Sequence, residues 1–246
     1  MRCAIILSTL AAAATASAAQ TTVLIDDFSD GEQVLDRSSV GSLIETAAAS
    51  SAVGGSRVAG LDVLETPFGI TSTVEIDRNN TDVYAFSSGA ANTAASSLLY
   101  DAGDTGLGLE LRSDSVFDVK FLFADMDFDM SVTLEDASGN LASSGITVPE
   151  TGNANTAQIL VSELETDGVF DLGNVHSVRF DFNTPFDFLP PGEQTPPEGL
   201  LTETPVAALD FIIDEISVTT PPIPAPGSVA LAGAGLLLMG TRRRRG

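Results

Sequence analysis

Residues 116–134 read VFDVKFLFADMDFDMSVTL, and this stretch decides the fold class. In its first half, every second residue from Phe117 to Phe123 is apolar, and in its second half the same holds from Met126 to Leu134. Alternation with a period of two is typical of a β-strand that buries one face. The two halves have opposite parity, which predicts a bulge or tight turn near Ala124.

Shorter segments of the same kind occupy most of the chain on either side. The expected strands cover 22–28, 61–64, 71–76, 83–86, 178–182 and 209–218, and turn residues separate them. Residues 46–60 read as a loop, residues 87–97 as a loop or a short helix, and residues 158–164 are the one candidate helix. Proline-rich residues 185–205 predict a long surface loop. Many short strands without a βαβ rhythm predict an all-β fold, an antiparallel, jelly-roll-like β-sandwich.

The charge of the chain restricts what it can bind. All 34 acidic residues lie between Asp26 and Glu215, whereas only six of the 11 basic residues do, so this part of the chain carries a net charge of −28. Such a charge repels nucleic acids and anionic lipids and attracts cations. We therefore expect no nucleic-acid partner. A solvated acidic surface that keeps the protein soluble also explains this charge.

The N-terminus has the pattern of a secretory signal peptide. Arg2 precedes an apolar run that is too short to span a bilayer, and the small residues Ala16, Ala18 and Ala19 predict signal cleavage there. The expected organisation is a signal peptide over residues 1–19, a β-sandwich domain over 20–220 and a C-terminal segment over 221–246. Export would use the Sec machinery. The only cysteine, Cys3, falls in the leader, so the expected domain has no disulfide and no cysteine metal site.

The C-terminal segment combines three features in order. A proline-rich break over residues 221–226 is followed by an apolar run, and Arg242, Arg243, Arg244 and Arg245 then precede the final glycine. Taken from 223 to 241, the run is long enough to cross a membrane as a helix. The arginine cluster would keep the C-terminus cytoplasmic. A plain C-terminal membrane anchor is one interpretation of this pattern.

The same features resemble the sorting signals of the PEP-CTERM group, which are substrates of exosortase-type transpeptidases in Gram-negative bacteria. The closest variant is VPLPA-CTERM, built on Val-Pro-Leu-Pro-Ala. Its last four positions correspond to Pro222, Ile223, Pro224 and Ala225, with Ile in place of Leu. Pro221 stands where Val is expected, and the Glu of the commoner Pro-Glu-Pro form is missing. The resemblance implies an exosortase partner, a transient stay in the inner membrane, and a final place at the cell surface or in an exopolysaccharide matrix.

The body of the chain resembles the galactose-binding-like jelly-roll modules in its first and last strands. The similarity rests on VLIDDFSD at 23–30 and ALDFIIDEISV at 208–218. Modules of this kind often hold a structural calcium ion between those strands. By that resemblance Asp26 or Asp27 would meet Asp210 or Asp214 at a calcium site, the only cofactor that we expect. Ordinary exposed carboxylates are the alternative.

No catalytic residue stands out. His176 is the only histidine, which excludes a multi-histidine zinc site, and no Gly-x-Ser-x-Gly motif is present to position a nucleophilic serine. Asp125, Asp127 and Asp129 have the spacing of a calcium loop, but Met130 replaces its glycine, so solvent-facing strand residues are the favoured interpretation. Acidic residues are too abundant for any one pair to indicate glycoside hydrolysis.

The sequence therefore predicts a non-enzymatic exported protein of the cell surface or extracellular matrix, associated with exopolysaccharide. The alternative function is a carbohydrate-binding module with structural calcium. It would bind polysaccharide on a shallow aromatic face, for which Tyr84, Tyr100 and the phenylalanines are the available aromatic residues. A secreted glycoside hydrolase is the third reading.

Overall fold

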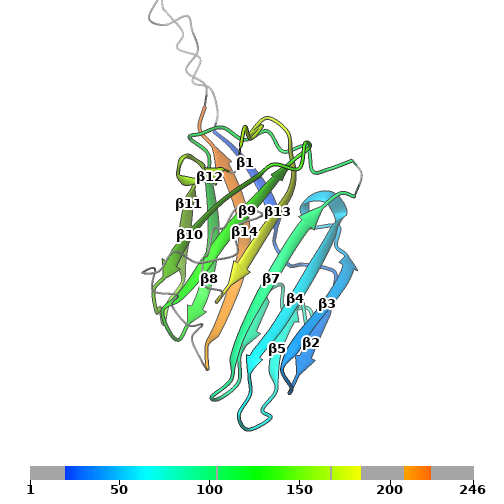
Figure 1. The fold of residues 1–246 in the computed structure, drawn as a ribbon, viewed down its shortest axis with the longest axis vertical. Helices are drawn as coiled ribbons and strands as arrows, with labels where there is room; N and C mark the ends of the chain where they lie inside the picture. The colour runs from blue at the N-terminus through cyan, green and yellow to red at the C-terminus, as the bar shows by residue number, and fades with distance from the viewer. Residues whose placement is uncertain (1–19, 104, 167, 184–207, 223–246) are drawn as a thin grey trace, which may run out of the picture. The chain divides into compact units, whose positions relative to one another are not determined.

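Antiparallel strands build almost all of the structure, a computed structural model that describes residues 20–103, 105–166, 168–183 and 208–222. The strands form two seven-stranded sheets (Figure 1). The two 3₁₀ turns, η1 and η2, cover only Val53–Gly55 and Val161–Glu163. This arrangement confirms the predicted all-β antiparallel sandwich.

The first sheet, called sheet A here, has the order β11-β8-β14-β6-β5-β2, and β1 also pairs with β14. Its strands are β1 (Thr21–Asp26), β2 (Gln33–Arg37), β5 (Ser72–Ile76), β6 (Tyr84–Ser87), β8 (Val116–Ala124), β11 (Asn155–Leu160) and β14 (Asp210–Thr220).

The second sheet, sheet B, has the order β12-β10-β9-β13-β7-β4-β3. Its strands are β3 (Gly41–Ala48), β4 (Ser56–Glu65), β7 (Thr93–Asp101), β9 (Phe128–Asp136), β10 (Leu141–Val148), β12 (Glu165–Thr166) and β13 (Val175–Phe182). The chain passes repeatedly from one sheet to the other, as in jelly rolls.

The stretch 116–134 makes one of these passages. Strand β8 lies in sheet A and β9 in sheet B, so the predicted change of parity is the connection between the two sheets. Phe121 and Phe128 both point into the core, where their ring centroids are 5.8 Å apart. Met126, expected to be apolar and inward, lies in the connection and is 37% exposed. The turn is thus confirmed, although two residues of the alternating pattern, Phe123 and Met126, are not buried.

A core of phenylalanine, tyrosine and aliphatic side chains fills the space between the sheets. Phe211 of sheet A stacks on Phe128 of sheet B at 4.9 Å and also contacts Phe182 at 5.3 Å. Trp is absent from the sequence, so Phe and Tyr supply the aromatic part of this core. Contacts of this kind between the two sheets hold the sandwich together.

Three segments differ from the sequence-based expectation. Residues 46–60, expected as a loop, contain the end of β3, the turn η1 and the start of β4, and residues 87–97 contain the start of β7. Small side chains suit these strands, because a Cβ atom at Gly60 would lie 2.4 Å from the Ser97 Oγ on β7. Residues 158–164, the candidate helix, are the end of β11 followed by η2. Tertiary packing overrides the weak local preference in each case.

The two terminal signals lie outside the described residues, apart from Pro221 and Pro222. The residues outside the described part include Ala16, Ala18 and Ala19 at the expected cleavage site. They also include Ile223, Pro224, Ala225 and Arg242 to Arg245 in the expected sorting signal. The expected loop over 185–205 is also outside the described part. Within the described residues, no helix reaches the length and apolar character that a membrane span requires. Residues Thr22–Thr220 form one compact unit.

Candidate functional site

The first and last strands are neighbours, as the calcium hypothesis requires, since β1 pairs with β14. The Thr22 and Thr219 hydroxyl oxygens are 3.2 Å apart. The carboxylates, however, point in different directions. Asp26 is fully buried between the sheets, whereas Asp214 is exposed on β14. The structure thus brings the two strands together without gathering Asp26, Asp27, Asp210 and Asp214 into one group.

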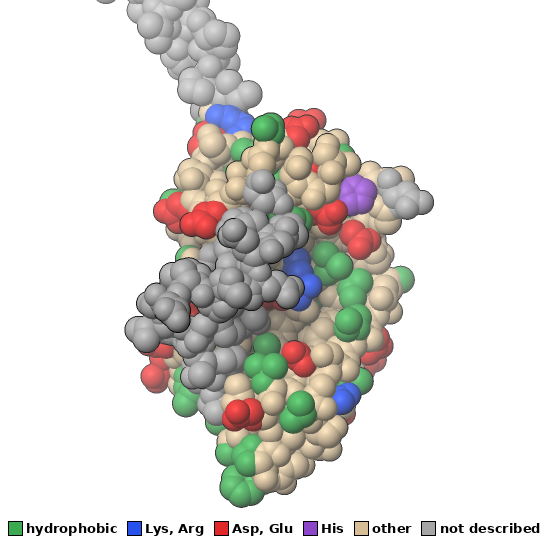
Figure 2. Space-filling view, viewed as in Figure 1, with side chains coloured by type: hydrophobic (Ala, Val, Ile, Leu, Met, Phe, Trp, Pro, Cys, Tyr) green, Lys and Arg blue, Asp and Glu red, His purple; other side chains and the backbone are tan. Residues whose placement is uncertain are grey.

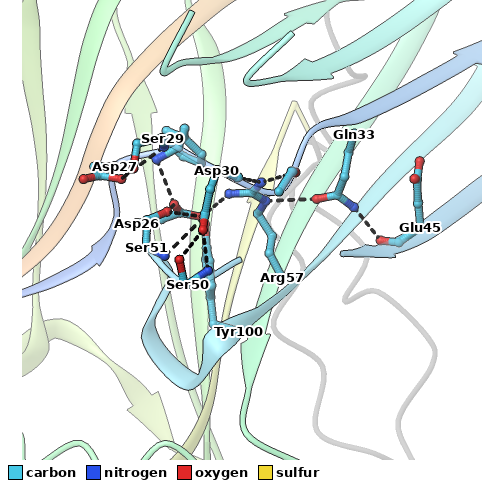
Figure 3. A network of polar contacts seen from close by, with 12 residues as sticks. Asp26, Asp27, Ser29, Asp30, Gln33, Glu45, Ser50, Ser51, Arg57 and Tyr100 are labelled. Atoms are coloured by element: carbon cyan, nitrogen blue, oxygen red, sulfur yellow. Dashed lines mark hydrogen bonds and ion pairs between the residues drawn. The ribbon is translucent and has the colours of Figure 1, made fainter. Parts of the chain in front are cut away.

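Asp26 has a cationic partner inside the protein. Its carboxylate accepts hydrogen bonds from the Arg57 Nη1 at 2.6 Å, the Tyr100 hydroxyl at 3.1 Å and the Phe28 N–H at 2.8 Å (Figure 3). Both side chains of the Asp26–Arg57 ion pair are 0% exposed. A buried carboxylate needs such a partner. Asp26 is therefore a structural residue of the fold.

Arg57 extends this network to the neighbouring turns. Its guanidinium donates to the Gln33 Oε1 at 3.0 Å and to the carbonyls of Asp30 and Gly31 at 2.9 and 2.7 Å. Gly31 has φ 73°, and a Cβ there would lie 2.9 Å from the Ala48 carbonyl. Only glycine fits this close, left-handed turn. The network links β1 and β2 of sheet A to β4 and β7 of sheet B.

The other acidic candidates hold turns and strand ends. Asp27 accepts hydrogen bonds from the N–H and hydroxyl of Ser29, and these lower its pKa. Asp125 accepts from the Asp210 N–H at 2.8 Å, Asp127 from the Glu150 N–H at 2.5 Å, and Asp129 from the Thr147 hydroxyl at 2.9 Å. The described residues contain no group of three or more His, Cys, Asp and Glu side chains that could hold a metal ion. Calcium binding stays a prediction.

His176 is the second residue of β13 and is partly exposed. Its carbonyl accepts a hydrogen bond from the Leu107 N–H at 2.9 Å. Its ring lies against the left-handed turn at Gly106, where a Cβ would come within 2.4 Å of the Nδ1. The imidazole therefore packs against a turn.

Among the described residues, the outer face of sheet A carries two adjacent rows of side chains, one polar and one mainly apolar. Cross-strand register places Asp36, Thr73, Ser87 and Asp210 in one row across β2, β5, β6 and β14. The next row contains Val34, Glu75, Ala85, Ile212 and Phe123, the last on β8. The side chains of these residues alternate with the buried ones of the same strands, so all nine face outward. We call these nine residues the platform.

The platform is hollowed at its centre. One open hollow of about 350 Å³ is lined by seven platform residues, Thr73, Glu75, Ala85, Ser87, Phe123, Asp210 and Ile212, and by the buried Phe86 and Phe211. A second hollow of about 350 Å³ adjoins it, since both include Glu75 and Ala85. Arg78, Asn79, Thr81 and Val83 of the β5–β6 hairpin complete its lining. The two hollows therefore lie next to each other on the sheet.

Strand irregularities bring Phe123 onto this face. The pairing of β8 with β14 skips Leu122 between Phe121 and Phe123, and it skips Asp214 between Ile213 and Glu215. Each skipped residue is the extra residue of a β-bulge. The bulge at Leu122 turns Phe123 outward, beside Ile212, although Phe123 has the same parity as the buried Phe121. This aromatic side chain is therefore partly exposed instead of buried.

The structure places the aromatic residues named as candidates for sugar binding partly in the core and partly at the surface. Tyr84 and Tyr100 are both 0% exposed, and burial raises the pKa of each hydroxyl. They belong to the core and cannot reach a ligand. Phe123 takes their place at the surface. The alternation within β5, β6 and β14 identifies the outward residues of each strand, but which strands are neighbours is not encoded in any local pattern.

Comparison with known proteins gives matches to solved structures only. No family model and no curated protein matches the chain. A family 11 carbohydrate-binding module from Clostridium thermocellum, solved with a β-1,3-1,4-mixed-linked tetrasaccharide, is 10% identical with a TM-score of 0.40. The match covers 83% of this chain and 98% of that one.

Two further matches are similar in extent. A family 29 carbohydrate-binding module is 11% identical with a TM-score of 0.36, and the match covers 82% of this chain and 90% of that one. A chain titled "Structure of PfGH50B" is 10% identical with a TM-score of 0.34, and here the match covers 77% of this chain but 24% of that one.

Proposed function

We propose that this chain is an exported, non-enzymatic binding protein that holds a carbohydrate chain on the platform of sheet A. The observation that carries the proposal is the pair of adjacent rows, one polar and one mainly apolar, in an open hollow. A sugar ring has an apolar face of C–H groups and a rim of hydroxyls. Ala85, Ile212 and Phe123 suit the C–H face, and Thr73, Ser87 and Asp210 can hydrogen-bond the hydroxyls.

The dimensions of the platform suit a polymer. Neighbouring strands spaced about 4.8 Å apart give the apolar row, over five strands, a length of about 19 Å and the polar row, over four strands, about 14 Å, enough for several sugar units. Both hollows are open to solvent, so a long chain can lie across this face without threading. A site for a small molecule would instead enclose most of its ligand.

The site chemistry favours binding over catalysis. Cleavage of a glycosidic bond needs a carboxylic acid whose pKa is raised and a second carboxylate, and the two must flank the scissile bond. Asp27, Asp30 and Asp136, which lie outside the platform, have lowered pKa values because hydrogen bonds stabilise their ionised forms, so none of these three suits that acid role. The hollow on the platform is open to solvent.

Binding of the purified full-length chain to a panel of polysaccharides, by affinity electrophoresis, tests the proposal. Phe123→Ala should reduce retardation by at least one polysaccharide of the panel, because the apolar row loses its aromatic face. Ile44→Ala is the control, since Ile44 is 75% exposed on β3 of sheet B. Equal retardation of the wild type and the Phe123→Ala variant, or retardation by no polysaccharide at all, would contradict the proposal.

The terminal signals support the cellular part of the proposal. We propose that the chain passes the inner membrane through the Sec machinery, and that an exosortase-type transpeptidase removes the C-terminal segment to release it to the cell surface or matrix. Arg242 to Arg245 should then be absent from the surface-located protein. Mass spectrometry of that fraction tests this, and an intact C-terminus there would mean that the segment is a plain anchor.

A further inference from the structure

The charges around the platform restrict its ligand further, provided that the platform binds carbohydrate as proposed. Two carboxylates, Asp36 and Asp210, stand at the ends of the polar row, with three strand spacings or about 14 Å between them. Neither carboxylate takes part in an ion pair or a side-chain hydrogen bond within the described residues. Glu75 lies between them in the second row, paired with Arg78.

No cation of the domain is available to balance these charges. Each of the six basic residues between Asp26 and Glu215 is already engaged. Arg57, Arg78, Arg112, Lys120 and Arg179 form ion pairs with carboxylates, and Arg37 donates hydrogen bonds to the carbonyls of Ser39, Val40 and Ser42. Figure 2 shows acidic side chains spread over the face in view, with few basic ones among them.

A uronic-acid polymer would therefore meet the unpaired carboxylates of Asp36 and Asp210 on the platform, and like charges repel. A neutral glucan would leave Asp36 and Asp210 with hydroxyl partners alone. A polymer that carries protonated amino groups would supply cationic donors along its length. Hydrogen bonds between an ammonium group and a carboxylate are stronger than those between neutral groups.

We infer that the platform selects a polysaccharide of amino sugars with free, protonated amino groups, which lie against Asp210 and Asp36 while the C–H faces rest on Ile212 and Phe123. Discrimination comes from charge at the ends of the polar row, and affinity for any sugar chain comes from the apolar row. The two contributions can be removed separately.

Calorimetric titration of the full-length chain with four soluble oligosaccharides tests the inference. The probes are oligomers of glucosamine, of N-acetylglucosamine, of glucose and of a uronic acid. Mildly acidic pH keeps the sugar amines protonated, while ordinary Asp and Glu side chains, with pKa values near 4, stay ionised. The glucosamine oligomer should bind most tightly and the uronic-acid oligomer most weakly. Salt at about 0.5 M should reduce the difference, because it screens exposed charges.

Substitutions separate a local effect from the general acidity of the protein. Asp210→Asn and Asp36→Asn should each weaken binding of the glucosamine oligomer by about two- to fivefold, the range expected for an exposed ion pair. They should weaken binding of the glucose oligomer less, because the Asn side chain loses the charge but still hydrogen-bonds sugar hydroxyls. Glu45→Gln removes one negative charge from β3 of sheet B and serves as the control, which should change neither affinity.

Each failure has its own signature. If Glu45→Gln weakens glucosamine binding as much as Asp210→Asn does, the attraction is unspecific and the inference is wrong. If the glucose or uronic-acid oligomer binds as tightly as the glucosamine oligomer, and Phe123→Ala abolishes that binding, the inference is wrong while the platform stands. If no oligosaccharide binds, the proposed function itself fails.

Discussion

Asp26 and Arg57 show what a single buried ion pair requires of its surroundings. Arg57 donates to one carboxylate, one side-chain amide oxygen and two backbone carbonyls, and its guanidinium carbon lies 5.5 Å from the centre of the Phe28 ring. Every polar atom of the pair has a partner, which is the condition under which a buried pair is tolerated.

We expect Arg57→Met to lower the free energy of unfolding by about 3–5 kcal/mol, because Asp26 is then left charged and buried without a cation. Urea unfolding measures this change. Arg179→Met is the control, because Arg179 forms an exposed pair with Asp181 and should cost less than about 1 kcal/mol. Similar losses for the two variants would mean that the buried pair contributes no more than a surface one.

Asp136 makes the stability of the folded state depend on pH. The Asn140 side chain and neighbouring N–H groups donate to its carboxylate and lower the pKa to about 2, from an ordinary value of 3.8. A lowered pKa in the folded state means that the ionised carboxylate stabilises the fold above the unfolded-state value. That stabilisation is lost as the pH falls from 3.8 towards 2.

Asp136→Asn should therefore lower the melting temperature at neutral pH. The gap between the wild type and this variant should narrow as the pH drops towards 2. Melting curves across this range check the prediction, with Glu45→Gln as the control that should melt like the wild type throughout. A gap that stays constant with pH would show that the loss comes from altered packing instead of charge.

At the scale of the strands, substitutions in β8, β9 and their connection test which side chains of this stretch are buried. Phe121→Ala and Phe128→Ala should each cost about 3–5 kcal/mol, since both rings are buried and each leaves a cavity. Asp127→Ala should cost less than about 1 kcal/mol, because Asp127 is exposed and holds only the Glu150 N–H. Urea unfolding distinguishes the two classes, and equal costs would mean that the strand faces are wrongly assigned.

Local sequence patterns predict where strands lie far better than they predict which strands pair with each other. The parity of 116–134, the strands at 178–182 and 209–218, and the all-β class follow from residue alternation alone. The two bulges in the β8–β14 pair do not, because a bulge arises from the register of two strands distant in sequence. Phe123 reads as a core residue for that reason, and the platform to which it belongs could not be predicted.

The sequence-based expectations fail most clearly in segments that are rich in small residues. Ala, Ser and Gly at 46–60 and 87–97 lack strand propensity, and yet β3, β4 and β7 run through them. Close approach between strands favours such residues, as Gly60 shows against Ser97. Whether a position requires a small residue depends on the partner strand, so the sequence of one segment alone does not predict it.

At the scale of the whole molecule, charge dominates, because the part between Asp26 and Glu215 carries a net charge of −28. Self-repulsion destabilises a compact state, and salt screens it, so NaCl should raise the melting temperature. The calcium hypothesis makes a further prediction in the same melts. Millimolar Ca²⁺ should raise the melting temperature beyond ionic-strength-matched NaCl, and Asp214→Asn should remove only that extra part. Equal shifts in Ca²⁺ and NaCl would leave no specific ion site.

The central claim is that carbohydrate lies on the platform of sheet A, and mapping a bound oligosaccharide by NMR chemical shifts tests it most directly. The account predicts that the backbone and methyl signals of Thr73, Ala85 and Ile212 move on titration, while those of Ile44 on sheet B stay in place. Shifts confined to sheet B, or spread evenly over the acidic surface, would contradict it.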